Sequence, residues 1–323
     1  MATLPLLEAI SLERHFDVSA PWLNRLIERR PRQILSAVDG VDFSILPGQT
    51  LALVGESGCG KSTVAKLVTG LQQPSGGRII HRGDPNRIQM IFQDPYASLN
   101  PRWRVSRIIA EPLLTLEPQT SKTIVRKRVN ELLELVGLSS TDGNKYPHEF
   151  SGGQRQRISI ARALSGSPEF IVCDEPTSAL DVSVQAQILN LMKKLQRELG
   201  LTYLFISHDL SVVRHMADVI AVMYLGRIVE IAHKQLLFEN PMHPYTKLLL
   251  ETIPDIDNPN TNRVPLSGEV PSPVNAPSGC SFHPRCSLAF DRCSREQPKR
   301  REDVHSGRVA CFSVERSLSD LNA

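Results

Sequence analysis

The sequence predicts an α/β fold with a helical subdomain, on three observations. Residues 50–71, "TLALVGESGCGKSTVAKLVTGL", form an apolar strand, a glycine-rich loop and a helix. Two more apolar strands, within 169–176 and 201–210, end in polar residues. The segment 123–138 has a helical apolar period and ends near Gly137. Strands that alternate with helices favour a sheet covered by helices. The apolar face of the predicted helix comprises Val125, Val129, Leu132, Leu133 and Val136.

Size and composition limit the alternatives. The 323 residues allow one large domain with an appendage, or two domains. A net charge of +3 is too small to indicate a polyanionic partner, and 41% hydrophobic with 22% charged residues is typical of a soluble globular protein. No run of about 18 apolar residues is present, so no membrane span is expected. The amino terminus lacks the layout of a secretory signal, which predicts a cytoplasmic location and reduced thiols.

The glycine-rich loop matches the P-loop pattern Gly55-x4-Gly60-Lys61-Ser62, with a strand before it and a helix after it. Small glycines allow successive backbone N–H groups to approach a phosphate, and the helix N-terminus favours an anion. Lys61 is expected to pair with the β- and γ-phosphates of ATP, and Ser62 to bind Mg²⁺. Cys59 is interpreted as a small filler without a catalytic role. The expected ATP-binding residues of this loop are Gly55, Ser57, Gly58, Cys59, Gly60, Lys61, Ser62 and Thr63.

Polar residues at the ends of the two later strands complete the expected catalytic group. The strand in "EFIVCDEP" ends in Asp174 and Glu175, and ligands of open α/β sheets gather at that end. Asp174 is expected to hold Mg²⁺, and Glu175 to act as general base on the attacking water. His208 follows the strand within 201–210 and is expected to contact the γ-phosphate.

A second phosphate-binding pattern lies in "FSGGQRQRISIARAL", residues 150–164. Ser151, two glycines and a helix N-terminus again suit an anion. One nucleotide does not need two such loops from the same chain. The pattern therefore favours two chains, each of which closes the other's nucleotide site.

With these motifs the chain resembles the nucleotide-binding subunits of ABC transporters over essentially its whole length. The resemblance implies that Gln93, in "MIFQDP", contacts Mg²⁺ and water in catalysis, and that His208 is the switch histidine. It also implies that an aromatic residue stacks on adenine, for which Phe16 is the first candidate and Trp22 the second. The residues that would act in trans on the partner's nucleotide are Ser151, Gly153, Gln154 and Asp181.

The stretches 93–102, "QDPYASLNPR", and 240–250, "NPMHPYTKLLL", are similar to the oligopeptide/dipeptide branch. "EFSGGQ" looks like the second of its two paired ATPase subunits. The resemblance implies a partner ATPase subunit, two transmembrane permease subunits and, indirectly, an extracytoplasmic solute-binding protein, at the cytoplasmic face of the inner membrane. The permease contacts are expected near Tyr96, Leu99 and Trp103, which are alternatively core residues. The transported solute is not encoded in this chain.

The tail contains Cys280, Cys286, Cys293 and Cys311, spaced C-x5-C-x6-C-x17-C. A reducing compartment disfavours disulfides. Four thiolates suit either a zinc ion or an iron–sulfur cluster, and the spacing leaves these two open. The resemblance implies a 4Fe–4S cluster, with zinc as the alternative. The tail has few large apolar residues, so a metal staple is expected to fold it.

These observations predict an ABC-type P-loop core with an antiparallel β portion over 1–251, with a helical subdomain at about 94–152. A Pro-rich linker over 252–279 and a small cysteine-bearing extension over 280–323 follow. The expected function is ATP hydrolysis that drives uptake of peptides or a related solute. The alternative is a soluble ABC ATPase that acts on nucleic acid, which the absence of a strongly basic stripe disfavours.

Overall fold

The computed structural model describes residues 4–21, 24–25, 27, 31–252, 271–302 and 307–321. The chain divides into two compact units. One comprises Met1–Leu7, Ser44–Thr50 and His81–Ser207. It contains two of the expected catalytic residues, Gln93 and Glu175. The other comprises Glu8–Phe43, Leu51–Ile80 and His208–Ala323, and contains the glycine-rich loop and the cysteines of the tail. We call them the helical unit and the P-loop unit.

The P-loop unit contains a run of strands in the order β10-β11-β9-β8-β3. β3 pairs in parallel with β8, with Leu51 opposite Val219. The β8–β9, β9–β11 and β11–β10 pairs are antiparallel, and the register of β8 against β9 shifts between Val222 and Met223. Bounds are β3 Thr50–Val54, β8 Val219–Tyr224, β9 Arg227–His233, β10 Arg301–Glu302 and β11 Arg308–Val309.

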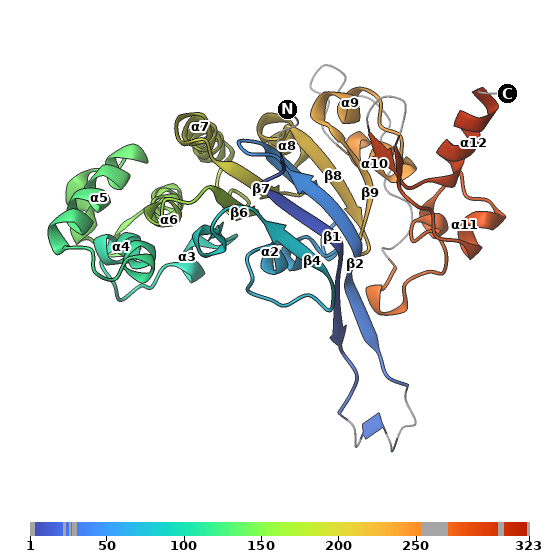
Figure 1. Cartoon of the computed structure of the whole chain (residues 1–323), viewed down its shortest axis with the longest axis horizontal. Coiled ribbons are helices and arrows are strands. Elements are labelled where there is room, and N and C mark those ends of the chain that lie inside the picture. Colours follow the sequence, from blue (N-terminus) through green and yellow to red (C-terminus); the bar gives the residue numbers. More distant parts are fainter. Residues whose placement is uncertain are drawn as a thin grey trace. The chain divides into compact units, whose positions relative to one another are not determined.

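A smaller, three-stranded sheet has the order β2-β1-β4. Its strands are β1 Leu7–Asp17, β2 Ile34–Ile45 and β4 Gly76–His81 (Figure 1). Residues 82–88 connect β4 to the next strand in the chain, which begins at Gln89. The helices of the P-loop unit are α2 Lys61–Val68, α8 Leu210–Met216, α9 Lys234–Glu239, α10 Pro244–Glu251, α11 Asp291–Arg295 and α12 Phe312–Leu321, with 3-10 turns η4 Pro273–Asn275 and η5 His283–Arg285.

The described part of the tail takes part in the core of the P-loop unit. Phe282 is 1% exposed and packs on Tyr224 and Tyr245, with ring centroids 5.2 and 5.4 Å away. Strand β11 extends the sheet at β9. The tail is short of apolar residues of its own because it shares a core with β8 and α10. A metal staple is therefore not needed to bury Phe282.

The helical unit has a parallel run of strands in the order β7-β6-β5. Phe170 lies opposite Thr202, and Gln89 lies opposite Ile171. All five residues of β6 and of β7 are buried, which explains their continuous apolar sequences. Bounds are β5 Gln89–Ile91, β6 Phe170–Asp174, β7 Thr202–Ile206, α3 Pro95–Ser98, α4 Val105–Leu116, α5 Lys122–Leu135, α6 Gly152–Ser165 and α7 Val182–Leu199, with 3-10 turns η1 Pro85–Arg87, η2 Ser140–Asn144 and η3 Pro147–Glu149.

Helices α3, α4 and α5 lie within the range predicted for the helical subdomain, about 94–152, and α4, α5 and α6 pack on one another (Figure 1). On α5 the predicted apolar face is buried at Val129, Leu132 and Leu133. Ser121 caps this helix by accepting the N–H of Ile124, and Gly137 follows it with a φ of +75°. The α/β fold class and the helix over this segment are confirmed.

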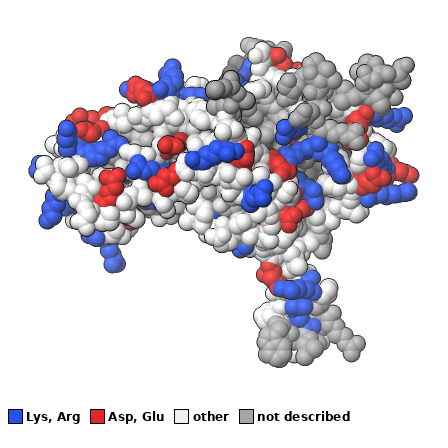
Figure 2. Space-filling model, viewed as in Figure 1, with Lys and Arg blue, Asp and Glu red and all other residues white. Residues whose placement is uncertain are grey.

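None of the helices in the described residues is long and apolar enough to cross a membrane. On the face drawn in Figure 2, positive and negative side chains are interspersed, without a continuous basic stripe.

Candidate functional site

Two positions of the glycine-rich loop between β3 and α2 have no room for any side chain, so only glycine fits there. At Gly55 an added Cβ would lie 2.1 Å from the carbonyl oxygen of Met223, and at Gly60 it would lie 2.1 Å from that of Ala37. Gly60, with a φ of +108°, precedes the first residue of α2 and has a left-handed conformation. The backbone therefore turns sharply and approaches its neighbours closely, which is the geometry of a phosphate-binding loop.

The ammonium of Lys61 is directed at the loop. Its Nζ donates to the carbonyl oxygens of Gly55 at 2.7 Å and Glu56 at 2.9 Å, and the residue is only 5% exposed. A buried positive charge at a helix N-terminus attracts an anion. Ser57, Gly58 and Ser62 are exposed at this end of the helix. Burial raises the pKa of the Cys59 thiol, so Cys59 is a neutral filler of the loop.

His208 lies in the same unit, directly before α8. Its side chain is exposed, and the next residue, Asp209, caps α8 by accepting the N–H groups of Ser211 and Val212. His208 therefore lies two positions before the first residue of α8. Phe16 lies on β1, half-buried, with the guanidinium of Arg14 4.7 Å from its ring centroid. The second adenine-stacking candidate, Trp22, lies outside the described residues.

The helical unit brings Gln93 and Glu175 together. Nε2 of Gln93 donates to Oε2 of Glu175 at 3.1 Å. Asp174, the last residue of β6, is 6% exposed. Glu175 has a φ of +47°, which is unusual for a residue with a Cβ, and its N–H donates to the carbonyl of Ile206 at 3.0 Å. Such strained backbone is concentrated at functional sites, and this feature is not visible in the sequence.

The residues expected to act in trans lie at two helix N-termini of the same unit. Ser151 caps α6 in a reciprocal arrangement with Gln154, and both are exposed. Gly153 faces α7 so closely that a Cβ would lie 2.4 Å from Cγ1 of Val184. Asp181 is exposed directly before α7. Both N-termini are therefore accessible to a second molecule.

The three expected permease contacts have different environments. Leu99 is 2% exposed and belongs to the core, so the alternative interpretation holds for it. Tyr96 is 62% exposed, with the guanidinium of Arg155 3.8 Å from its ring centroid. Trp103 is half-buried, and Arg107 lies 4.0 Å from its ring centroid. Tyr96 and Trp103 stay candidates for such a contact.

The four tail cysteines line one small cavity together with Phe282, His283 and Phe312. Burial raises the pKa of Cys280 to about 11 and also raises the pKa of Cys286 and Cys311. Among the described residues, no group of three or more His, Cys, Asp or Glu side chains is arranged to hold a metal ion. The iron–sulfur site and its zinc alternative are therefore not confirmed. The donor atoms suit either group, but they are not clustered as ligands.

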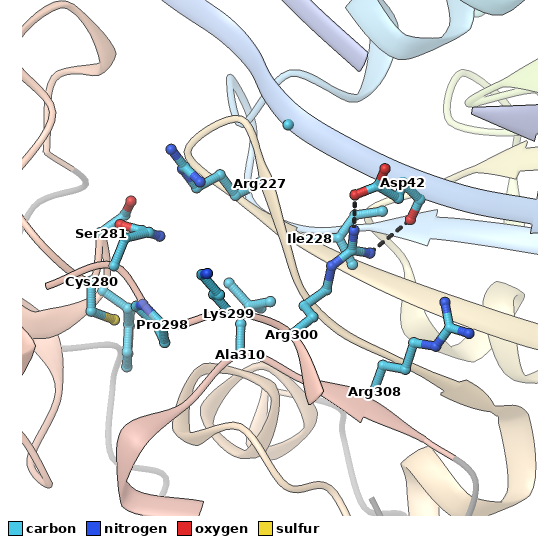
Figure 3. Close-up of a pocket in the computed structure, with 14 residues that line it drawn as sticks. Asp42, Arg227, Ile228, Cys280, Ser281, Pro298, Lys299, Arg300, Arg308 and Ala310 are labelled. Atoms are coloured by element: carbon cyan, nitrogen blue, oxygen red, sulfur yellow. Dashed lines mark hydrogen bonds and ion pairs between the residues drawn. The ribbon is translucent and has the colours of Figure 1, made fainter. Parts of the chain in front are cut away.

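A larger cavity of the P-loop unit lies beside the tail (Figure 3) and was not expected from the sequence. Its cationic residues are Arg227, Lys299, Arg300 and Arg308. Arg300 is bound to Asp42, with Nη2 2.6 Å from the carboxylate and Nη1 2.7 Å from the backbone carbonyl. Arg227 forms an ion pair of 2.6 Å with Asp39. Arg300 therefore joins the tail to β2, and Arg227 joins β9 to β2. Because acids already pair with these two arginines, we assign no ligand to the cavity.

Sequence reasoning also missed the residues that hold Glu56, within the glycine-rich loop. Its carboxylate forms an ion pair with Arg285 of the tail, and its N–H donates to the hydroxyl of Tyr245. Neither residue belongs to a nucleotide-binding pattern, and 229 positions separate Glu56 from Arg285. No local sequence signal could have identified this contact.

Comparison with known proteins identifies relatives over the full length. A family model described as ABC transporter matches residues 38–178, and one described as oligopeptide/dipeptide transporter, C-terminal region, matches 229–293. The chain is 50% identical to a putative oligopeptide transport ATP-binding protein, YkfD, of Bacillus subtilis over 96% of both chains. It is 48% identical to the dipeptide transport ATP-binding protein DppF of Escherichia coli, over 96% of this chain and 95% of that protein.

Solved structures agree with the fold. CbiO1 of Clostridium perfringens, part of the ABC transporter complex CbiONQ, aligns with a TM-score of 0.61 at 27% identity, over 73% of this chain and 91% of that one. The ATP-binding cassette MJ0796, a dimer bound to ADP and Pi in a post-hydrolysis state, aligns with a TM-score of 0.60 at 27% identity. That alignment covers 71% of this chain and 98% of the other.

Proposed function

This chain belongs to the ATP-binding subunits of oligopeptide and dipeptide ABC transporters, and from that premise we propose that it hydrolyses ATP to drive the uptake of peptides or a related solute through separate membrane subunits. Such subunits are ATPases coupled to transport. The observation that carries the proposal within the structure is the glycine-rich loop, with the buried Lys61 ammonium directed at its carbonyl oxygens.

ATP binding at this loop follows from its chemistry. The loop N–H groups and the N-terminus of α2 bind the phosphates, and Lys61 exchanges its carbonyl partners for the β- and γ-phosphate oxygens. The half-buried Phe16 stacks on adenine. Ser62, Gln93 and Asp174 would hold Mg²⁺, an oxygen donor set that this ion prefers, and the bound ion would offset phosphate charge. Gly55, Ser57, Gly58, Cys59, Gly60 and Thr63 complete the proposed ATP site.

Hydrolysis requires a general base. Glu175 removes a proton from the attacking water, while Gln93 orients the carboxylate through the bond of 3.1 Å, and His208 contacts the γ-phosphate. Ser151, Gly153, Gln154 and Asp181 act on the nucleotide of the partner ATPase subunit, supported by their position at exposed helix N-termini. We propose that two bound ATP molecules close the pair of subunits and that hydrolysis reopens it.

The partners follow from the family. We propose a second ATPase subunit, identical or related, two transmembrane permease subunits and an extracytoplasmic solute-binding protein that delivers the solute. The chain would lie peripherally at the cytoplasmic face of the inner membrane. By function, residues 1–251 would form the ATP-binding domain, 252–279 a linker and 280–323 an extension, even though the described part of the tail packs within the P-loop unit.

We also propose that Cys280, Cys286, Cys293 and Cys311 bind a 4Fe–4S cluster, with zinc as the alternative. The support is that all four thiols line one cavity. Ligation would require their side chains to rearrange. Metal and acid-labile sulfide analysis of anaerobically purified protein tests this. About four iron and four sulfide per chain support the cluster, one zinc supports the alternative, and no bound metal contradicts both.

The transport proposal is tested with the complete complex in liposomes. We expect a peptide-loaded binding protein to stimulate ATP hydrolysis and labelled peptide to accumulate, and Lys61→Ala in this chain to impair both. Stimulation by DNA or RNA in place of peptide would support the nucleic-acid alternative, which the relatives do not favour.

A further inference from the structure

A residue inside the glycine-rich loop is held by the tail. Nη1 of Arg285 donates to Oε2 of Glu56 at 2.8 Å, and Nη2 donates to Oε1 at 3.0 Å. The side chain of Arg285 is 5% exposed and that of Glu56 is 17% exposed. Two parallel hydrogen bonds between opposite charges, shielded from water, are strong and fix the orientation of both groups.

The backbone of Glu56 is held by Tyr245 of α10, which packs against the tail. Its N–H donates to the hydroxyl of Tyr245 at 3.0 Å, and the ring of Tyr245 packs on Tyr224 and Phe282. Arg285 also donates to the hydroxyl of Tyr224 at 3.4 Å. Glu56 is thus bound through its N–H to Tyr245, 189 positions later in the chain, and through its side chain to Arg285, 229 positions later.

Charge makes the contact relevant to nucleotide binding. Glu56 adds a negative charge to a loop that must receive the phosphates of ATP, and its backbone carbonyl already lies 2.9 Å from Nζ of Lys61. Arg285 neutralises the carboxylate and occupies both of its oxygens. Without Arg285, the free carboxylate would repel the phosphates and compete with them for the Lys61 ammonium.

We propose that Arg285 is a positioning residue for ATP binding, which holds Glu56 and so fixes the conformation and the charge of the glycine-rich loop. The inference rests on the proposed ATP site. It also couples that site to the cysteine segment, because Arg285 ends η5 and directly precedes Cys286, whose N–H donates to the carbonyl of His283 at 3.2 Å. A displacement of this turn displaces the clamp on Glu56.

The test uses the complete transporter complex with Arg285→Gln in this chain. We expect the KM for ATP to rise about tenfold, because a buried charged hydrogen bond is lost, while kcat is retained. Arg285→Lys should give a smaller rise, because an ammonium cannot make the two parallel bonds. Binding of a fluorescent ATP analogue to the full chain is measured in parallel and should weaken in the same order.

Two control variants separate loop positioning from tail attachment. Arg300→Gln removes the ion pair of 2.6 Å with Asp42, which ties the tail to β2 away from the loop. Arg292→Gln removes an exposed ion pair of 2.9 Å with Glu296 on the tail itself. Both should keep the wild-type KM. If Arg300→Gln raises the KM as much as Arg285→Gln does, tail docking explains the effect and the proposal is wrong.

The remaining outcomes are also decisive. An unchanged KM in Arg285→Gln overturns the proposal. If this variant does not fold, Arg285→Lys decides, since a raised KM with retained kcat supports the proposal and a wild-type KM overturns it. Wild-type protein that binds the ATP analogue but does not couple hydrolysis to peptide uptake would sink the transport function, and the binding data would still test Arg285.

Discussion

Nε2 of Gln93 lies 3.1 Å from Oε2 of Glu175, although 82 positions separate the two residues in the sequence. The amide donates to the carboxylate and orients it, while the left-handed backbone of Glu175 is held by its N–H bond to Ile206. The carboxylate is therefore held by Gln93 and the backbone that carries it by Ile206. This is the arrangement expected of a general base that must be positioned before water attacks.

Glu175→Gln should abolish most of the turnover and preserve ATP binding. The amide keeps the shape of the side chain but cannot accept a proton, and loss of a general base costs about 10²–10⁴ in rate. Phosphate release by the assembled complex measures the effect. Glu198→Gln, on the exposed face of α7, is the matched control and should behave as wild type. Near wild-type turnover in Glu175→Gln would remove this residue from its proposed role.

The sequence predicted the parts of the site that depend on local patterns. The glycine-rich loop, the two carboxylates at the end of β6 and the helix α5 are each encoded in a short run of residues. Their spacing therefore carries the signal. The hydrogen bond between Gln93 and Glu175 was not predicted, because nothing local links the two positions and the family resemblance implied only a contact of Gln93 with Mg²⁺ and water.

The sequence could not predict how the tail packs. Phe282 is buried against Tyr224 and Tyr245, and Arg285 binds Glu56, so these contacts join residues far apart in the chain. The tail has few large apolar residues, from which the sequence predicts that a metal is needed to fold it. A segment with few apolar residues can complete the core of a neighbouring sheet, and no local pattern in the sequence shows this.

Gly60→Ala should disrupt the glycine-rich loop. The backbone φ of Gly60 is +108°, which a residue with a Cβ rarely adopts. The added Cβ would also lie 2.1 Å from the carbonyl oxygen of Ala37. We expect a loss of roughly 2–4 kcal/mol in the free energy of unfolding and weaker nucleotide binding. Gly70→Ala is the control, because its φ is +74° but nothing lies within 4 Å of the added atom. It should cost only about 1 kcal/mol. Equal losses in the two variants, measured by denaturant titration, would show that the close approach is irrelevant.

His243 should make the stability of the P-loop unit depend on pH. Burial lowers its pKa to about 3, and its Nδ1 accepts the N–H of Tyr245 at the start of α10. The His243 imidazole binds a proton near pH 6.5 in the unfolded chain, but it stays neutral at that pH in the folded chain. Its contribution to the free energy of unfolding is therefore fully present above pH 6.5. It falls by about 2 kcal/mol between pH 6.5 and 5.

The variant His243→Asn isolates this effect, since Asn can still cap α10 but does not titrate. Burial also raises the pKa of Glu230, which receives the N–H of His243. The contribution of Glu230 to stability has the opposite sign, because it is lost as the pH rises. This contribution is the same in the wild type and in His243→Asn. Thermal melts from pH 7.5 to 5 should show a steeper decline in wild type. Parallel curves would contradict the assignment of the slope to His243.

Ser151→Asp should separate the role of Ser151 at the partner's nucleotide from its role as a helix cap. Ser151 accepts the N–H of Gln154 at 3.3 Å, so Ser151→Ala would weaken α6 as well as remove the hydroxyl. Aspartate also caps helices well, but it places a negative charge where a phosphate should bind. We expect unchanged thermal stability, unchanged ATP affinity of the isolated chain and strongly reduced hydrolysis in the assembled complex.

The matched control for this variant is Ser121→Asp, at the N-terminus of α5, where the serine accepts the N–H of Ile124 at 3.4 Å. Both serines are exposed caps of the same unit, but only Ser151 begins a signature-like "SGGQ" segment. Ser121→Asp should therefore hydrolyse ATP at the wild-type rate. If Ser151→Asp lowers the ATP affinity of the isolated chain as strongly as it lowers hydrolysis in the complex, the residue acts within its own chain. The assignment in trans would then have to be abandoned.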